Sequence, residues 1–181
     1  MNSAASGALT PVVFFDRDGT LNRDLGHTHR PEDLDWLDGA IDAIREVNQR
    51  GWLAVVVTNQ AGVAHGYYDE AAIGRFHAHM NAELAVTDAR IDAFYYCPFH
   101  PQAKIERYRH PNHPDRKPNP GMLSRAFVDL SADPRRALII GDQDCDLAAG
   151  RAAGIETAVA TGANLRDVLI EASTRAPWGS P

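Results

Sequence analysis

The stretch VVFFDRDGTLN, residues 12–22, decides the fold. Four apolar residues run directly into Asp16 and Asp18, and a glycine and a threonine follow them. A short continuous apolar run is typical of a strand that is covered on both faces. In an open parallel sheet, ligands bind beyond the carboxyl ends of the strands. The two acids therefore stand where the chemistry of such a sheet is expected.

Four more apolar runs of strand length occur along the chain, at 52–58, 91–97, 137–141 and 156–161. Helical patterns lie between the runs, at 39–51, 69–86, 120–130 and 145–154. Alternating strands and helices indicate βαβ units. We predict a single α/β domain, 1–181, with a doubly wound parallel sheet of the Rossmann-like type. Its core is expected over about 11–162, with disordered tails at 1–9 and 175–181.

Charge and composition exclude several classes of protein. The formal net charge of −6 leaves no general basic face for a nucleic acid. The segment 98–119 is irregular and rich in proline, histidine and basic residues. Neither a signal peptide nor a membrane span is recognisable, and two distant cysteines demand no disulfide. We expect a cytoplasmic protein without membrane contact, and a monomer because no conspicuous apolar helix face suggests an interface.

The predicted strands bring further polar residues to the same edge of the sheet. Thr58 and Asn59 end the second run, whereas Asp142 and Asp146 follow the fourth. Lys117, next to Arg116, precedes a predicted helix and supplies positive charge. Taken singly, Thr58 or Asp142 would be read as a helix cap and Lys117 as a solvated lysine. A calcium loop of the EF-hand type is disfavoured, because its glycine and final glutamate are not at the required positions.

Acids, a hydroxyl and a lysine in this order suit phosphoryl transfer through an aspartyl-phosphate. One carboxylate of the first pair attacks phosphorus, and the second protonates the leaving alcohol and later takes a proton from water. Mg²⁺ is the expected cofactor, because this cation prefers carboxylates, waters and phosphate oxygens. Together with Lys117 and the Thr58 hydroxyl, it would balance the charge of the transferring group.

The motif DRDGT, followed by Thr58, Lys117 and GDQDCD, resembles the motif series of the haloacid dehalogenase-like phosphatases. The resemblance implies that Asp16 is the nucleophile and Asp18 the acid/base. It also implies that Asp16, Asp18 (through its carbonyl) and Asp142 hold Mg²⁺. The intervals between the motifs leave no room for an additional cap domain, so a capless enzyme is expected.

The longer stretches TNQAGVAHGYYDE, YYCPFHP and RKPNPGML extend the likeness to one family. Over roughly 11–162 the chain resembles the D-glycero-D-manno-heptose 1,7-bisphosphate phosphatases. This implies hydrolysis of that sugar phosphate to heptose 1-phosphate, a step toward lipopolysaccharide. The alternatives are a histidinol-phosphate phosphatase, from a related family, and a non-catalytic binding module on the same fold. The substrate contacts implied are Asn22, Arg23, Asp24, His27, Thr58, Asn59, Gln60, Arg116 and Lys117.

The chain departs from this family in the segment before Lys117, where relatives carry four zinc ligands. Cys97 keeps the first of these places, but Phe99, His113 and Asp115 replace the other three. A rebuilt zinc site would be formed by Cys97, His100, His110 and His113. We favour a metal-free loop instead, so zinc is not an expected cofactor. His65, where relatives often have arginine, is a second departure.

Overall fold

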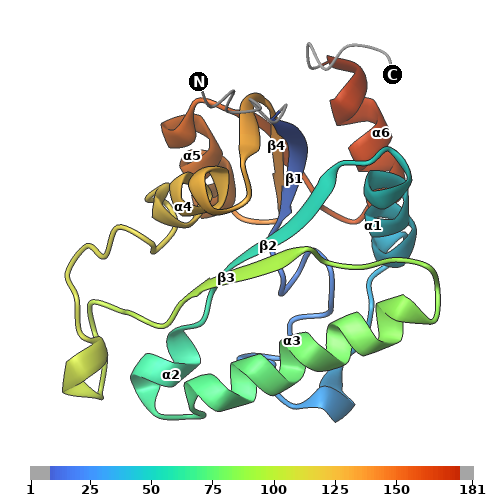
Figure 1. Cartoon of the computed structure of the whole chain (residues 1–181). Coiled ribbons are helices and arrows are strands. Elements are labelled where there is room, and N and C mark those ends of the chain that lie inside the picture. The colour runs from blue at the N-terminus through green and yellow to red at the C-terminus, as the bar shows by residue number, and fades with distance from the viewer. Residues whose placement is uncertain (1–8, 176–181) are drawn as a thin grey trace, which may run out of the picture.

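The computed structural model describes residues 9–175, and its centre is a five-stranded sheet. The strands are β1 (Thr10–Phe15), β2 (Leu53–Asn59), β3 (Ala93–Cys97), β4 (Ala132–Gly141) and β5 (Glu156–Val159). Their spatial order is β3-β2-β1-β4-β5, and all neighbouring strands are parallel (Figure 1). From β1 the chain adds β2 and β3 on one side, and it then crosses to add β4 and β5 on the other. This topology confirms the predicted doubly wound α/β fold.

Helices cover both faces of the sheet because the side chains of β1 alternate between two apolar clusters. The helices are α1 (Ala40–Gln49), α2 (Ala61–His65), α3 (Glu70–Ala85), α4 (Gly121–Asp129), α5 (Asp144–Ala153) and α6 (Leu165–Arg175). Val13 and Phe15 pack in the cluster that contains residues of α1, α3 and α6. Val12 and Phe14 pack in the cluster with α4 and α5, on the opposite side of β1 and β4 in Figure 1. All four side chains are fully buried.

Local signals set where two of the longer helices begin. The Asp69 side chain accepts a hydrogen bond from the Ala72 backbone N–H at 2.8 Å, which caps α3. In α5, the Asp146 carboxylate accepts a hydrogen bond from the Gln143 N–H at 3.0 Å. This bond fixes Asp146 in the first turn of α5, directly after the carboxyl end of β4.

The structure differs from the sequence-based expectation in several elements. Strand β4 begins at Ala132 instead of 137, because Thr10 pairs with Ala132 before the register shifts. Helices α2 and α6 were not predicted, nor were the 3₁₀ turns Pro31–Asp33 and Glu106–Tyr108. Helix α6 buries Leu165, Leu169 and Ala172 in the core, which therefore extends beyond 162. The expected tails lie outside the described residues, except for Leu9 and for Arg175, which ends α6.

The irregular segment 98–119 is held by a small apolar cluster of its own. Ala103 and Tyr108 of this segment are buried against Val63 and Ala64 of α2 and against Ile73 of α3. The Tyr108 hydroxyl donates to the Glu70 carboxylate of α3 at 2.7 Å, as does the Tyr96 hydroxyl of β3. Between β1 and α4, the described chain contains no additional folded unit, in agreement with a capless enzyme. No helix within 9–175 has the length and apolar character needed to cross a bilayer.

Candidate active site

A cavity of about 410 Å³ opens at the carboxyl ends of β1, β2 and β4. Asp16 directly follows β1, Thr58 is the penultimate residue of β2, and Asp142 directly follows β4. The residues that line this cavity include Asp16, Asp18, Thr58, Gln60, Tyr68, Arg116, Lys117, Gln143 and Cys145. A larger hollow of about 630 Å³ shares Tyr68 with it but contains none of the acids that follow β1 and β4. The smaller cavity is therefore the site where the sequence-predicted groups converge.

Lys117 lies inside a buried ionic cluster. Its ammonium group is 2.7 Å from Asp16 Oδ1 and 2.6 Å from Asp146 Oδ1, and it donates to the Val57 carbonyl at 2.8 Å. Burial alone would lower the pKa of Lys117, but the Asp16 and Asp146 carboxylates outweigh burial and raise that pKa above its ordinary value. Lys117 is therefore protonated and neutralises part of the surrounding negative charge.

Asp16 has more negatively charged than positively charged neighbours, namely Asp146 and Asp18 against Lys117. Burial is the largest influence and, with the nearby Asp146 and Asp18 charges, raises the pKa of Asp16 to about 7, although Lys117 acts in the opposite direction. Asp142 is affected in the same way, because burial raises its pKa and Asp146 adds to this effect. An additional cation near these groups would favour their ionised forms.

Three of these carboxylates are arranged as a candidate metal site. Oxygens of Asp16, Asp142 and Asp146 all lie within 4.8 Å of one another. A cluster of hard carboxylate oxygens fits Mg²⁺ by its donor chemistry. Gly19 permits this arrangement, because a Cβ on its backbone would lie 2.4 Å from Asp142 Oδ2. The Thr20 hydroxyl also donates to Asp142 Oδ1, at 3.3 Å.

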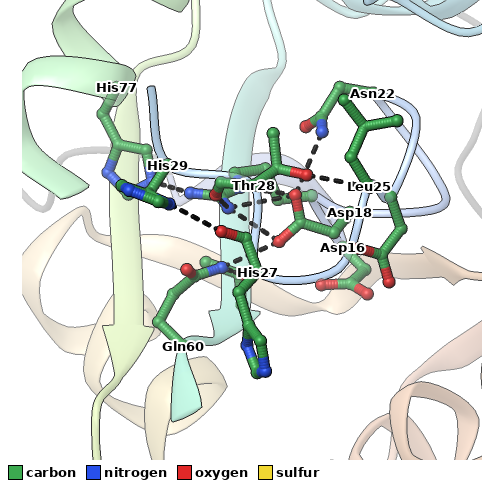
Figure 2. A network of polar contacts seen from close by, with 12 residues as sticks. Asp16, Asp18, Asn22, Leu25, His27, Thr28, His29, Gln60 and His77 are labelled. Carbon is green, nitrogen blue, oxygen red and sulfur yellow. Dashed lines mark hydrogen bonds and ion pairs between the residues drawn. The ribbon is translucent and has the colours of Figure 1, made fainter. Parts of the chain in front are cut away.

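Asp18 does not join the acidic cluster with its side chain but lies in a network of donors (Figure 2). Arg17 donates to it through Nη2 at 2.7 Å and through Nε at 3.1 Å. Asn22 Nδ2 donates at 3.0 Å and Gln60 Nε2 at 2.9 Å. Gln60 Nε2 also donates to Thr58 Oγ1 at 2.9 Å, so Gln60 links the Asp18 carboxylate to the Thr58 hydroxyl near the end of β2.

A family model and individual relatives both identify the chain as a haloacid dehalogenase-like hydrolase. The HAD-hydrolase-like family matches residues 115–177. The D-glycero-beta-D-manno-heptose-1,7-bisphosphate 7-phosphatase of Salmonella typhi is 40% identical over 168 residues, which are 93% of this chain and 88% of that protein. The corresponding enzyme of Escherichia coli K12 is 39% identical, over 93% and 87% of the two chains. The chain belongs to the heptose 1,7-bisphosphate phosphatase family of haloacid dehalogenase-like hydrolases.

Solved structures agree with this family assignment. A HAD-like phosphatase from Mesorhizobium loti superposes with a TM-score of 0.82 at 31% identity, covering 94% of this chain and 89% of that one. The D,D-heptose 1,7-bisphosphate phosphatase of B. bronchiseptica, in complex with magnesium and phosphate, gives a TM-score of 0.74 at 29% identity, over 90% and 87%. As a member of this family, the protein is a phosphoric monoester hydrolase.

The residues expected to contact substrate divide into two groups. Most of them line the cavity: Asp24, His27, Thr58, Asn59, Gln60, Arg116 and Lys117. Asn22 and Arg23 do not. Asn22 is fully buried and its amide donates to Asp18, whereas Arg23 pairs with Asp35 at 2.6 Å on the surface. Asn59 also clamps the backbone of Lys117, since its side chain accepts from the Lys117 N–H and donates to the Lys117 carbonyl.

Sequence reasoning gave no role to several residues that shape the site of this phosphatase. Asp146 was placed near the sheet edge but assigned no role, although it contacts Lys117 and completes the acidic cluster. The sequence did contain a signal for a role of Asp146, because Asp142 and Asp146 lie four residues apart at a strand-to-helix junction. No comparable signal pointed to Tyr68, whose hydroxyl donates to Gln60 Oε1 at 2.7 Å.

The four residues considered for a rebuilt zinc site, Cys97, His100, His110 and His113, form no common ligand set in the described chain. Instead, the Phe99 ring stacks on the His113 ring, with centroids 4.0 Å apart and planes 5° from parallel. Cys97 Sγ lies 3.9 Å from His113 Nδ1, and the same nitrogen accepts from the Asp115 N–H at 3.1 Å. An aromatic pair thus occupies two positions that the family pattern gives to zinc ligands.

Proposed function

We propose that this protein is a Mg²⁺-dependent phosphatase that converts D-glycero-D-manno-heptose 1,7-bisphosphate to heptose 1-phosphate. The convergence of Asp16, Asp18, Thr58 and Lys117 on one cavity, with Asp142 close to Asp16, carries the reaction class. The substrate is supported by the names of the relatives that align with more than nine-tenths of the chain.

In the proposed reaction, a carboxylate oxygen of Asp16 attacks phosphorus, and the bond from phosphorus to the sugar oxygen breaks. Asp18 donates a proton to the departing sugar oxygen. It then accepts a proton from a water molecule that attacks the phosphoryl group on Asp16. This second step releases inorganic phosphate and restores both carboxyl groups to their starting states. These separate roles require the side chains of Asp16 and Asp18 to be held apart. Their different partners support this assignment, because Asp16 pairs with Lys117 and Asp18 with Arg17.

Lys117 and Thr58 are proposed to bind the phosphoryl oxygens. Lys117 is fixed by Asp16, Asp146 and the Val57 carbonyl, so its charge is available at the nucleophile without reorganisation. Thr58 is nearly fully buried, and its hydroxyl is held by Gln60. These contacts orient the two groups before the substrate arrives.

The Mg²⁺ ligands are proposed to be Asp16, Asp142 and the Asp18 backbone carbonyl, with Asp146 next to them. When bound, the cation would supply positive charge to the phosphoryl oxygens and reduce repulsion among the carboxylates. The magnesium and phosphate in the B. bronchiseptica relative support this choice of cation.

Phosphate release from heptose bisphosphate and from histidinol phosphate, with Mg²⁺ or with a chelator, tests the proposal. We expect metal-dependent turnover with preference for the sugar bisphosphate. The Asp16→Asn variant should lose at least about a thousandfold in kcat while its circular dichroism spectrum stays native. Preference for histidinol phosphate would reassign the substrate, and full activity of Asp16→Asn would refute the nucleophile.

A further inference from the structure

The side chain of Arg17, between the two acids of the first motif, carries a completely buried positive charge. A buried guanidinium is costly unless its N–H groups are paired. Arg17 cannot accept a hydrogen bond, so each of its partners must offer a lone pair. The positions of these partners therefore determine where the guanidinium lies.

Two sides of the guanidinium bind groups that belong to the active site. Nε and Nη2 donate to the Asp18 carboxylate, the proposed proton donor. Nη2 also donates to the Thr28 carbonyl at 2.5 Å. Thr28 follows His27, which lines the cavity, so the Arg17 side chain connects Asp18 to the loop at the cavity wall. Figure 2 shows Asp18, His27 and Thr28.

The third side of the guanidinium faces His77, which comes from the middle of α3 and does not line the cavity. Arg17 Nη1 lies 3.4 Å from His77 Nε2. Since Arg17 is only a donor, Nε2 must accept, and the proton of the neutral imidazole then resides on Nδ1. Burial, together with the Arg17 charge, lowers the pKa of His77 to about 3, which is consistent with a neutral acceptor.

Aromatic rings fix both members of this pair. The His77 ring stacks on Phe94 of β3, with centroids 4.2 Å apart and planes 14° from parallel. The Arg17 guanidinium lies over the Phe76 ring, 4.6 Å from its centroid. The imidazole therefore has little freedom to turn away, and neither has the guanidinium.

We propose that His77 is a positioning residue that orients Arg17 and, through Arg17, the proton donor Asp18 and the loop at Thr28. This inference rests on the proposed function, because it assumes that Asp18 protonates the leaving group. Without an acceptor at position 77, Nη1 loses its described partner inside the protein. The guanidinium then turns toward other acceptors, and the Asp18 carboxylate turns with it.

The test compares two aryl esters of similar shape, para-nitrophenyl phosphate and phenyl phosphate, in the presence of Mg²⁺. The nitrophenolate leaves readily without a proton, whereas phenolate is a poor leaving group that needs one. kcat/KM includes the steps up to departure of the leaving group, so it reports on proton donation by Asp18 and not on the later attack of water.

His77→Phe keeps a stacking ring but removes the acceptor, whereas His77→Gln retains an acceptor oxygen. We expect His77→Phe to lower kcat/KM about 10- to 100-fold for phenyl phosphate and less than about threefold for para-nitrophenyl phosphate. His77→Gln should recover most of the loss. His79→Phe, on the same helix but facing Glu83 at the surface, is the matched control and should behave as wild type.

Equal losses for the two esters in His77→Phe would overturn the proposal, because a general structural defect affects both. Failure of His77→Gln to restore the phenyl ester would overturn it as well. If His77→Phe does not fold, His77→Met supplies the same apolar replacement with a more adaptable side chain. A wild-type protein that released no phosphate from either ester or from heptose bisphosphate would instead refute the proposed function, and the inference with it.

Discussion

Acidification from about pH 7 to about pH 5 should destabilise the protein by about 2 kcal/mol through His77 alone. The perturbation is protonation of this imidazole in the unfolded chain. Burial and the Arg17 charge lower the folded pKa of His77 from 6.5 to about 3. Between these two values, the unfolded state binds a proton that the folded state does not. The free energy of unfolding therefore rises with pH in this window and falls on acidification.

The magnitude follows from the linkage relation. A pH of about 5 lies about 1.5 units below the pKa of the imidazole in the unfolded chain. Each unit changes the free energy of unfolding by about 1.4 kcal/mol. The difference from about pH 7 is then about 2 kcal/mol. The pKa of about 3 in the folded state has little effect on this difference, because pH 5 lies well above it.

Urea unfolding at several pH values between 5 and 7, with a chelator present, measures this contribution. Other groups also titrate in this range, so the informative quantity is the difference between wild type and His77→Gln. The variant cannot take up the proton, and its stability should fall by about 2 kcal/mol less than that of wild type. Parallel stability curves for the two proteins would refute the buried, neutral state of His77.

Three further predictions concern the charged cluster and the loop before it. Lys117→Met leaves the Asp146 carboxylate buried without its cation, and should cost about 3–5 kcal/mol in urea unfolding; a loss below about 1 kcal/mol would contradict the buried pairing. Gly19→Ala combines a backbone φ of 85° with a Cβ 2.4 Å from Asp142 Oδ2, and should raise the Mg²⁺ concentration needed for half-maximal activity about tenfold or more. An unchanged Mg²⁺ requirement would show that Asp142 tolerates displacement. Protein purified without added metal should contain far less than one equivalent of zinc by elemental analysis, whereas one equivalent would contradict the expectation that zinc is not a cofactor.

Much of the fold was predictable because buried parallel strands leave a local signal. Each of the five apolar runs became a strand. The signal is clearest in β1, β2 and the second half of β4, which are buried on both faces, whereas the edge strand β5 is partly exposed. Helix α2, with five residues, is too short for a periodic pattern to stand out. Helix α6 was overlooked although apolar residues recur at 165, 168, 169 and 172, the spacing of one helical face.

The sequence by itself determined the alternation of the five strands with the helices α1, α3, α4 and α5, and the kinds of group at the sheet edge. Both follow from local patterns, namely apolar runs that end in acids, a hydroxyl or a lysine. Only the tertiary structure decided which of these groups touch. It placed Asp146 against Lys117, turned the Asp18 side chain away from the acidic cluster, and set His77 behind Arg17. Such contacts join residues from separate strands and helices, and they depend on packing geometry that no local pattern encodes.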